Sequence, residues 1–376
     1  MVFRFLRRRF FGHAGGNLAT LRVLLTTPYD LAVPGGVNRH ALDLLETLAG
    51  RGIDVRLVGP ASASVSAGGG RVTVMGRVSV GSLNGARSRV TLDLGIGGEM
   101  KRLIAEFRPD VVHLQEPFLP TLNTFALLHA GAARRVGTFH TYSETSRGYL
   151  WAWPWCRWVN ARLDARVAVS ESAREFATAY HPAEFAVIPN GVRLPAADAV
   201  RGARALGKPV RVLFVGRADE PRKGFAVLRE AMERLEAETP GAFVLDAVGP
   251  ATARGEVSAA ELSAAYAAAD VCAVPSVGGE SFGLVALEAL AHGTPVVASR
   301  IRGYADWLEG AGAGRLVPAG DAEALAGALR GLTADAAEYA SCARRTREVA
   351  ARYDWNRGVE RLLRIYEGAP VSKDEG

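Results

Sequence analysis

Beginning at Leu21, apolar runs bounded by Gly or Pro alternate with segments whose apolar residues recur at helical spacing. Short apolar runs between turn residues are typical of buried strands in parallel sheets, and helical spacing indicates amphipathic helices. The alternation therefore predicts repeated strand–helix units and an α/β fold with doubly wound parallel sheets. The first series of predicted strands comprises LRVLLTTPY from Leu21, DVRLVGP from Asp54, DVVHLQEP from Asp110, RVGTFHTYS from Arg135 and ARVAVS from Ala165.

A second series begins at Val210, after a Pro-, Gly- and Ala-containing stretch without strong periodicity. Its predicted strands are VRVLFVGR from Val210, FVLDAVGP from Phe243, DVCAVPS from Asp270 and TPVVASR from Thr294. The predicted helices include one that starts around Gly35 and Gly36 and stops at Gly50, and the helices 225–238 and 282–291. Two Rossmann-like domains follow from the two series, with ligands expected at the carboxyl ends of the strands. We predict an N-terminal extension at 1–20, domains at 21–200 and 201–354, a C-terminal helix at 355–368 and a tail at 369–376.

The chain length agrees with two domains, because single hydrophobic cores stop growing well below 376 residues. The net charge of +6 suits anionic ligands such as phosphates or an acidic membrane surface, and does not by itself indicate nucleic acid. No run reaches the roughly 18 apolar residues of a membrane-spanning helix. The three cysteines form no CxxC pair, so we expect reduced thiols in a cytoplasmic protein.

The first residues, MVFRFLRRRFFGH, mix Arg with Phe and lack the apolar core and cleavage site of a signal peptide. Two interpretations remain open for this segment. It is either a disordered or wrongly assigned start, or an interfacial anchor whose aromatic and Arg side chains contact lipid headgroups.

The stretch GESFGLVALEAL, from Gly279 to Leu290, carries two carboxylates in an otherwise apolar helix and its entrance. A glycine-containing loop before a helix start leaves backbone N–H groups free to bind an anion. A carboxylate at Glu288, among apolar residues, requires a hydrogen-bond donor such as a ribose hydroxyl pair. The alternatives are that Glu280 only favours the helix dipole and that Glu288 pairs with an Arg.

A second loop, RADEPRKGF, follows the predicted strand at 210–215. Arg217 leaves the strand end and Lys223 lies where the next helix begins, so two cations converge on a helix N-terminus. Positioned cations stabilise the growing charge of a diphosphate leaving group. The alternative is a solvated loop in which Arg217 pairs with Asp219 or Glu220.

The first domain offers weaker candidates. Gly35 and Gly36 stand at a helix start, where glycine permits close approach of a phosphate or sugar but also occurs in plain turns. His140 lies at a strand end, and a single His is more often structural than catalytic. The turn SLNGARSRV offers further candidate ligand-binding residues, which are Asn84, Gly85, Arg87 and Arg89. The alternative is that these are ordinary charges exposed to solvent.

Several motifs are absent from the sequence. There is no D-x-D, no HExxH and no cluster of Cys and His, so neither a metal holding a diphosphate nor a zinc site is indicated. There is also no G-x-G-x-x-G after the first strand and no G-x-x-x-x-G-K-[ST]. Nicotinamide-dependent and ATP-dependent functions therefore lose their main support.

Taken together, these motifs resemble those of retaining glycosyltransferases of family 4, which have the two-domain GT-B fold. The resemblance spans roughly Leu21 to Glu367 and is strongest toward the phosphatidyl-myo-inositol mannosyltransferases of actinobacteria. The matching segments are VPGGV, DVVHLQEP, TFHT, AVSES, IPNGV, GRADEPRKG, ESFGLVALE, AHGTPVVAS and YDW.

The resemblance implies a GT-B enzyme with two Rossmann-like domains facing across a cleft and a C-terminal helix crossing back to the first domain. It implies that Arg217 and Lys223 hold the donor diphosphate, that Glu288 holds the ribose and that Glu280 holds the transferred sugar. The backbone N–H groups of Phe282 and Gly283 assist Glu280. The catalytic set is then His140, Arg217, Lys223 and Glu280, and the donor-binding set is Gly35, Gly36, Arg89, Arg217, Lys223, Ser281, Phe282, Gly283, Leu284 and Glu288.

The implied reaction moves a hexose, in the first interpretation mannose from GDP-mannose, to a lipid acceptor such as phosphatidylinositol. The alternatives are a UDP-sugar with a glycan or small soluble acceptor, and a non-catalytic protein that binds nucleotide sugars. No cofactor, metal or nucleic acid is expected. The implied location is the cytoplasm, with possible contact of the chain with the anionic inner face of the plasma membrane.

Some segments depart from the family pattern. Only ATARGEV separates AVGP from the next helix, so an edge strand of the second sheet and base recognition near 255–257 are both in doubt. Gln115 stands where the family commonly has His, and the basic helix expected for a lipid acceptor is reduced to GGEMKRLIAEFR. Trp with Arg suits membrane contact, and a core or interdomain aromatic cluster is the alternative. The aromatic segment YLWAWPWCRW contains Trp151, Trp153, Pro154, Trp155, Arg157 and Trp158.

Overall fold

The computed structural model describes residues 20–83, 86–142, 151–196, 200 and 206–369, which form two compact units. The first unit comprises 1–169, 173–188 and 358–376, and the second comprises 170–172 and 189–357. The predicted extension at 1–20, the tail at 369–376 and the Asn84–Gly85 turn lie almost entirely outside the described residues, as do the side chains of 82–88.

The first unit contains a seven-stranded sheet in the order β3-β2-β1-β6-β7-β8-β9. Every neighbouring pair of strands in it is parallel. The strands are β1 (Arg22–Thr26), β2 (Asp54–Gly59), β3 (Val72–Val74), β6 (Val111–Gln115), β7 (Arg134–Phe139), β8 (Ala165–Ala168) and β9 (Ala186–Val187). An antiparallel hairpin joins β4 (Val78–Leu83) to β5 (Ala86–Thr91). All the strands predicted for the first series are confirmed.

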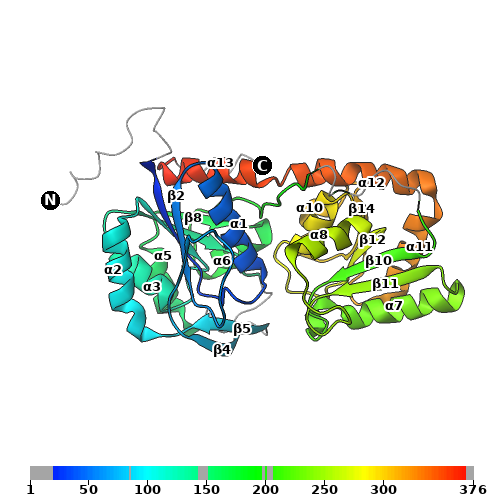
Figure 1. Cartoon of the computed structure of the whole chain (residues 1–376), viewed down its shortest axis with the longest axis horizontal. Helices are drawn as coiled ribbons and strands as arrows, with labels where there is room; N and C mark the ends of the chain where they lie inside the picture. Colours follow the sequence, from blue (N-terminus) through cyan, green and yellow to red (C-terminus); the bar gives the residue numbers. More distant parts are fainter. Residues whose placement is uncertain (1–19, 84–85, 143–150, 197–199, 201–205, 370–376) are drawn as a thin grey trace. The chain divides into compact units, whose positions relative to one another are not determined.

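Helices cover both faces of this sheet, with α2 and α3 on one side and α1 on the other (Figure 1). The helices are α1 (Gly36–Gly50), η2 (Leu94–Ile96), α2 (Gly97–Phe107), α3 (Leu122–His129), α5 (Trp153–Asn160), α6 (Glu171–Tyr180) and α13 (Trp355–Tyr366). The helix predicted to start around Gly35 and Gly36 and to stop at Gly50 is confirmed as α1. Residues of α13 from Gly358 onward belong to the first unit.

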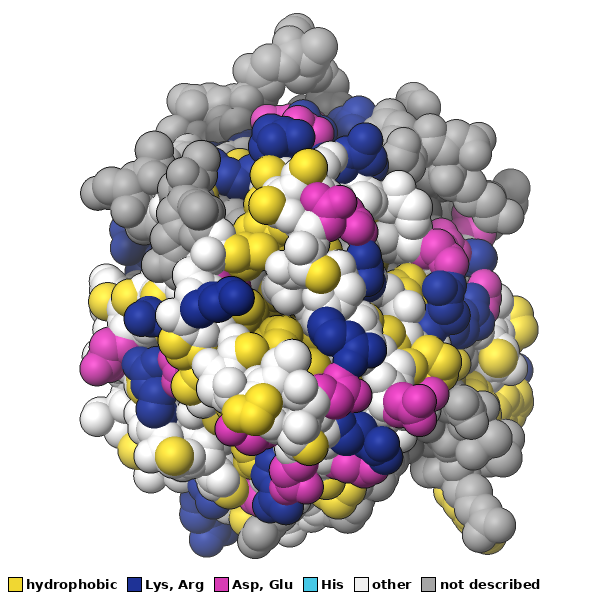
Figure 2. All heavy atoms as spheres, turned by 90° about the vertical axis from the view of Figure 1, so that its right-hand side faces the viewer, with side chains coloured by type: hydrophobic (Ala, Val, Ile, Leu, Met, Phe, Trp, Pro, Cys, Tyr) yellow, Lys and Arg dark blue, Asp and Glu magenta, His cyan; other side chains and the backbone are white. Residues whose placement is uncertain are grey.

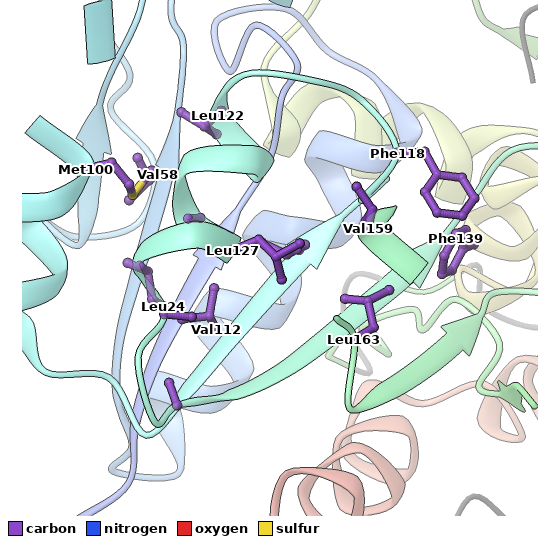
Figure 3. Packing of buried hydrophobic residues seen from close by; sticks show 14 of the residues in the cluster. Leu24, Val58, Met100, Val112, Phe118, Leu122, Leu127, Phe139, Val159 and Leu163 are labelled. Atoms are coloured by element: carbon purple, nitrogen blue, oxygen red, sulfur yellow. The ribbon is translucent and has the colours of Figure 1, made fainter. Parts of the chain in front are cut away.

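Alternation along the strands explains why two layers of helices form. Leu24 of β1 and Val112 of β6 pack with Met100 of α2 and with Leu122 and Leu127 of α3 (Figure 3). Successive residues of a strand point to opposite faces, so Val23 and Leu25, which are also fully buried, face the layer that contains α1. Phe118 and Phe139 close one end of the first cluster, with ring centroids 5.0 Å apart.

The second unit contains a five-stranded parallel sheet in the order β11-β10-β12-β13-β14. Its strands are β10 (Val210–Val215), β11 (Phe243–Val248), β12 (Val271–Val274), β13 (Val296–Ser299) and β14 (Gly314–Val317). Its helices are η4 (Pro221–Lys223), α7 (Phe225–Glu238), α8 (Ala259–Ala268), α9 (Leu284–Ala291), α10 (Arg302–Leu308), α11 (Ala322–Ala334) and α12 (Ala336–Ala351). The predicted strands of the second series and the helix 225–238 are confirmed.

The second sheet is also buried on both faces. Val212 and Phe214 of β10 belong to a cluster formed with α7, α11 and α12, whereas Leu213 between them belongs to a cluster formed with α8, α9 and α10. Residues buried on both faces explain why these strands read as continuous apolar runs.

Two predictions for the second unit are refined by the structure. The helix predicted at 282–291 begins at Leu284, because Gly283 in the left-handed conformation (φ +86°) precedes it as the N-cap. The short segment after β11 forms a turn closed by a Gly249–Gly255 bridge, and β11 is the edge strand of the sheet. The described residues between β11 and α8 contain no further strand, which settles the question that the short sequence there had left open.

Acidic and basic side chains are interspersed on the face that Figure 2 displays. On the second unit, exposed pairs such as Arg234–Glu230 (2.8 Å) and Arg254–Asp246 (2.7 Å) follow this pattern. Cys156, Cys272 and Cys342 are all buried free thiols. Within the described ranges, no helix has the length and apolar character needed to cross a membrane.

Candidate active site

Two loops of the second unit begin at the carboxyl ends of neighbouring strands. The loop 216–224 follows β10 and the loop 275–283 follows β12, and these strands pair in parallel. Both loops therefore lie at the same edge of the sheet, where ligands of open parallel sheets bind. The backbone N–H of Val277 donates to the carbonyl of Arg222 over 2.8 Å, which joins the two loops directly.

Glu280 lies between two cations from the other loop. Its Oε1 accepts a hydrogen bond from Nζ of Lys223 and one from Nη1 of Arg222, the latter over 3.0 Å. The Glu280 side chain is only 15% exposed, and Arg222 also pairs with Glu220. We call Arg222, Lys223 and Glu280 the Glu280 cluster.

Electrostatics keeps the Glu280 carboxylate charged. Burial on its own would raise the pKa of Glu280, but the charges and hydrogen bonds of Lys223 and Arg222 outweigh burial and hold the pKa below its ordinary value. The Glu280 cluster therefore combines two cationic side chains with one hydrogen-bond-accepting carboxylate at a site that is largely shielded from water. Such a site can bind both a phosphate and a sugar hydroxyl.

Glycine is required where the two loops approach one another. A Cβ on Gly224, whose φ is +70°, would lie 1.9 Å from the carbonyl oxygen of Pro275. A Cβ on Gly283 would lie 2.1 Å from the ring of Tyr304. The Tyr304 hydroxyl in turn hydrogen-bonds to Oγ of Ser276 over 2.9 Å. These contacts fix the backbone that presents the Glu280 cluster.

Arg217 is placed at the end of β10, as the sequence predicted, but outside the Glu280 cluster. The distance from its Nε to Oδ1 of Asp219 is 3.9 Å, which is an ion pair without a hydrogen bond. Among the described residues, the buried Nε of Arg217 has no hydrogen-bond partner. The predicted alternative of a pair with Asp219 is therefore present only in a weak form.

Glu288 lies on α9, half-buried, and accepts a hydrogen bond from the Tyr266 hydroxyl over 2.9 Å. The Tyr266 ring stacks on His292, whose Nδ1 contacts the Glu288 carbonyl over 2.7 Å. The donor that the sequence required for this carboxylate is thus a tyrosine in this structure. Tyr266 holds the Glu288 side chain at one position on the helix surface.

The remaining predicted donor-binding residues of the second unit bracket the start of α9. Phe282 is buried against Trp307 and Tyr353, and its carbonyl accepts a hydrogen bond from Trp307 Nε1 over 2.8 Å. The Ser281 carbonyl accepts one from Oγ of Ser172 over 3.2 Å. Leu284 is the first residue of α9, which has no side-chain cap.

In the first unit, α1 begins with backbone N–H groups that no side chain caps. Gly35 is its extended N-cap and Gly36 its first residue, and a Cβ at Gly35 would meet no atom within 4 Å. The preceding loop is fixed by Asn38, whose amide donates to the carbonyl of Asp30 over 2.7 Å. The start of α1 is therefore sterically open, and the hydrogen bond of Asn38 holds the loop before it in place.

Arg89 forms an ion pair within the first unit. Its Nη1 lies 3.6 Å from Oδ2 of Asp30, which is 1% exposed. Burial raises the pKa of Asp30, but the hydrogen bonds from Ser62 and Ala32 and the charge of Arg89 lower it by more. The pKa of Asp30 is therefore below its ordinary value. Arg89 thus has a local structural role besides the ligand contact that the resemblance implies.

His140 follows β7 and is 7% exposed. Its backbone N–H donates to Glu116 Oε1 and its Nε2 contacts Gln115 Oε1, both over 2.8 Å. Burial, followed by the nearby His40 and His113, lowers the pKa of His140 well below its ordinary value. His140 is therefore a neutral imidazole near neutral pH.

Sequence reasoning missed several residues that the structure places at these sites. Arg222 is not among the predicted site residues, yet the η4 turn brings both Arg222 and Lys223 to Glu280. Tyr266 and Tyr304 lie far from the motif in sequence. Glu116 gave one usable signal, because a buried carboxylate directly after an apolar strand needs donors, which here are His140 and Thr141.

Comparison with known proteins assigns the family. A family model described as Glycosyltransferase Family 4 matches residues 34–194, and one described as Glycosyl transferases group 1 matches residues 209–335. The chain belongs to glycosyltransferase family 4. It is therefore an enzyme, a hexosyltransferase of the retaining type, as the motifs predicted.

Named relatives of this transferase match nearly its whole length. It is 34% identical over 381 residues to a phosphatidyl-myo-inositol mannosyltransferase of Mycobacterium leprae, covering 94% of this chain and 98% of the relative. It is 35% identical over 371 residues to the protein of the same name from Mycolicibacterium smegmatis, covering 92% and 94%.

Solved structures agree in fold. Sucrose-phosphate synthase from Thermosynechococcus elongatus has a TM-score of 0.67 and 24% identity, and the match covers 92% of this chain and 98% of that chain. An Anabaena protein crystallised with UDP-glucose has a TM-score of 0.68 and 16% identity, with 92% and 99% covered. The two parallel-sheet units of the transferase are those of the GT-B fold.

Proposed function

We propose that this transferase moves mannose from GDP-mannose to a phosphatidylinositol-like lipid. The observation that carries the proposal is the Glu280 cluster, in which two cations and one carboxylate converge beside a helix start at the carboxyl edge of a parallel sheet. That combination suits a ligand with a diphosphate at one end and a hexose at the other. The extended similarity to phosphatidyl-myo-inositol mannosyltransferases supports the choice of sugar and acceptor.

In this proposal each residue of the second unit has one task. Lys223, together with Arg217, binds the diphosphate, and Glu280 orients the sugar hydroxyls with help from the N–H groups of Phe282 and Gly283. Glu288 binds the ribose hydroxyls from its position on α9. Ser281 and Leu284 complete the helix start that faces the donor.

The proposed chemical step conserves the configuration at the anomeric carbon. The bond between this carbon and the leaving phosphate oxygen breaks as a bond to the acceptor hydroxyl oxygen forms on the same face. The acceptor proton passes to the departing phosphate oxygen. Lys223 and Arg217 stabilise the charge that develops on the diphosphate, and His140 contacts the reacting sugar as a neutral group.

We propose that this reaction requires no metal ion, because the cations of the site carry out the charge stabilisation. In the described part of the chain, no group of three or more His, Cys, Asp or Glu side chains could hold a metal ion. Mannose transfer in the presence of EDTA at the rate seen with added magnesium is the expected outcome. Abolition of transfer by EDTA would contradict this part of the proposal.

A second candidate donor is a UDP-sugar, with a glycan or small soluble acceptor. The observation in its favour is the fold shared with the Anabaena protein crystallised with UDP-glucose. The two donors differ in the base, which the family binds near the segment that is shortened to a turn at 249–255 here.

Calorimetric titration with GDP, UDP, GDP-mannose and UDP-glucose separates the candidates. We expect selective binding of GDP and GDP-mannose, weakened at least tenfold in Lys223→Ala because a charge-assisted contact to phosphate is lost. Lys208→Ala is the matched control, since Lys208 is an exposed lysine of the same unit. Selective UDP binding would favour the second candidate. Equal affinities of Lys223→Ala and wild type would overturn the site.

The proposed place of action is the inner face of the plasma membrane, reached from the cytoplasm. Among the four clustered tryptophans, Trp155 and Trp158 pack against the core of the first unit, whereas Trp151 is 87% and Trp153 is 45% exposed. Trp155 and Trp158 thus fit the core interpretation that the sequence left open. Trp151 and Trp153, beside Arg157, are the residues we propose for contact with anionic lipid.

A further inference from the structure

A continuous row of polar side chains is buried in the first unit between α13 and the end of β7. His113, Gln115 and Thr138 lie on the neighbouring strands β6 and β7, and all three are at most 1% exposed. Tyr366 reaches them from α13, and His140 lies at the other end. Polar groups buried this deeply are retained only where each finds a partner.

The contacts along this row are short. His113 Nδ1 lies 2.7 Å from the Tyr366 hydroxyl, and His113 Nε2 lies 2.6 Å from Oγ1 of Thr138. The amide nitrogen of Gln115 faces the same His113 Nε2 at 3.5 Å, and its amide oxygen lies 2.8 Å from His140 Nε2. Gln115 is therefore the link between the two imidazoles.

The chemistry of an amide fixes the direction of these hydrogen bonds. The NH₂ group of Gln115 can only donate, so the Nε2 of His113 that it faces accepts. The Thr138 hydroxyl, 2.6 Å from the same Nε2, then also donates to it, and the proton of His113 is on Nδ1. The Tyr366 oxygen then accepts from Nδ1. At the other end the amide oxygen of Gln115 can only accept, so Nε2 of His140 carries a proton.

Both imidazoles are neutral, so tautomer rather than charge distinguishes their states. Burial, followed by His40, lowers the pKa of His113 to about 3, and the pKa of His140 is also well below normal. Besides Gln115 and the nearby His113, the groups that face His140 are His40, whose ring centroid lies 4.6 Å away, and Glu116, which binds its backbone. Nδ1 of His140 makes no hydrogen bond to any described residue.

We infer that Gln115 is a positioning residue that, with Tyr366 and His113 behind it, holds His140 as the tautomer protonated on Nε2. Nδ1 of His140 is thereby kept as a hydrogen-bond acceptor for a donor hydroxyl. Where His140 acts on the transferred sugar, an assignment that rests on the proposed function, the acceptor at Nδ1 would receive a hydrogen bond from a sugar hydroxyl. Tyr366, the last residue of the C-terminal helix α13, thus influences the tautomer of His140 at the end of β7.

The tautomer is measured directly by long-range nitrogen–proton NMR correlation of the histidine rings in the full-length protein. The chain has seven histidines, and the His140 signals are assigned by their loss in His140→Asn. We expect one neutral tautomer with the proton on Nε2. A proton on Nδ1 of His140 in the wild type, or a mixture of both tautomers, would overturn the inference. This outcome can be read from the wild-type protein alone.

Two variants test the role of the row. Gln115→Met keeps the shape of the side chain and removes both amide groups, and we expect the His140 signals to shift to an average of the two tautomers. Tyr366→Phe, which removes only a hydroxyl, should change the His113 tautomer and shift His140 in the same direction. Tyr339→Phe is the matched control, because its buried hydroxyl binds the Asp270 carbonyl in the second unit, over 2.7 Å. Unchanged His140 signals in both row variants would overturn the inference.

A kinetic readout separates positioning from stability. With GDP-mannose as donor we expect Gln115→Met to lower kcat on the order of tenfold with little change in KM, because a misplaced contact acts mainly on the transition state. A change confined to KM would contradict the positioning role. Absence of transfer by the wild type would instead contradict the proposed function, and the NMR result would stand independently of it.

Discussion

At the scale of single residues, Glu280 shows how the local environment decides what a carboxylate can do. Its side chain is 15% exposed, yet it remains charged because Lys223 and Arg222 both donate to it. Glu116 in the first unit is the opposite case. Burial raises the pKa of Glu116, and the hydrogen bonds that it accepts from Thr141 and His140 offset this only in part.

The sign of the Glu280 shift sets a pH dependence. Because the pKa of Glu280 is lower in the folded than in the unfolded state, the folded state binds fewer protons. The stability from this group is present in full above the ordinary carboxylate pKa of about 4.3 and is lost as pH falls through the lower, folded value. We expect Glu280→Gln to cost roughly 1–3 kcal/mol near neutral pH.

Chemical denaturation of wild type and Glu280→Gln at several pH values checks this prediction. The difference in their free energies of unfolding should shrink as the pH is lowered toward about 3. Asp246→Asn is the matched control, because its pair with Arg254 in the same unit is largely exposed. A difference that grows at low pH would show that Glu280 is stabilised in its protonated form.

A pair of glycines separates backbone strain from steric overlap. Gly224 and Gly241 both have φ +70°, but a Cβ on Gly224 would lie 1.9 Å from the Pro275 carbonyl, whereas one on Gly241 meets no atom within 4 Å. Gly241→Ala should cost about 1–2 kcal/mol, the price of a left-handed alanine. Gly224→Ala should cost more than about 4 kcal/mol, since the two loops must separate.

Thermal or urea unfolding measures the free energy of unfolding of each variant. Gly224 and Gly241 both lie in the second unit, so their losses are compared on the same transition. Equal losses in Gly224→Ala and Gly241→Ala would mean that the approach of loop 216–224 to Pro275 is not rigid. Reduced nucleotide binding in a folded Gly224→Ala would further show that this approach shapes the Glu280 cluster.

At the scale of elements, the two sides of the short helix α5 differ in burial. Trp155 donates to the carbonyl of Phe118 over 3.0 Å and stacks on Trp158, so the inner side of α5 holds the core. The exposed Trp153 has the guanidinium of Arg157 5.5 Å above its ring. An aromatic ring with a neighbouring cation is suited to the headgroup region of a membrane.

Vesicle co-sedimentation tests the surface formed by Trp151 and Trp153, just before and at the start of α5. The double variant Trp151→Ser, Trp153→Ser should reduce binding to anionic vesicles several-fold, without loss of thermal stability, because neither ring belongs to the core. Val244→Ser, a change of a 42% exposed apolar residue in the second unit, serves as control. Vesicle binding unchanged by the double variant would contradict the proposed lipid contact of Trp151 and Trp153.

The elements also show what the sequence could and could not predict. The strands β1, β2, β6, β7, β8 and β10 to β13 and the helix 225–238 follow from apolar runs and helical spacing, which reflect burial on two faces. The short strands β3, β9 and β14 and the β4–β5 hairpin were not predicted. The start of α9 was placed two residues early because a left-handed Gly283 before the helix has no signature in spacing. The partners of the site residues were not predictable, since Tyr266, Tyr304 and Tyr366 act across long sequence separations.

At the scale of the whole molecule, each unit contributes a separate part of the proposed chemistry. The second unit holds the Glu280 cluster and Glu288 at the carboxyl edge of its sheet. The first unit holds His140, the open start of α1, and the exposed Trp151 and Trp153 just before and at the start of α5. The residues of α13 from Gly358 onward belong to the first unit, so the chain returns to that unit at its end.

The most direct test of the central claim is transfer of labelled mannose from GDP-mannose into phosphatidylinositol vesicles by the purified enzyme. The account predicts a mannosylated lipid with the α configuration of the donor, formed equally with EDTA, and lost in Lys223→Ala but not in Lys208→Ala. Donor binding without any lipid product, or product formed at full rate by Lys223→Ala, would contradict it.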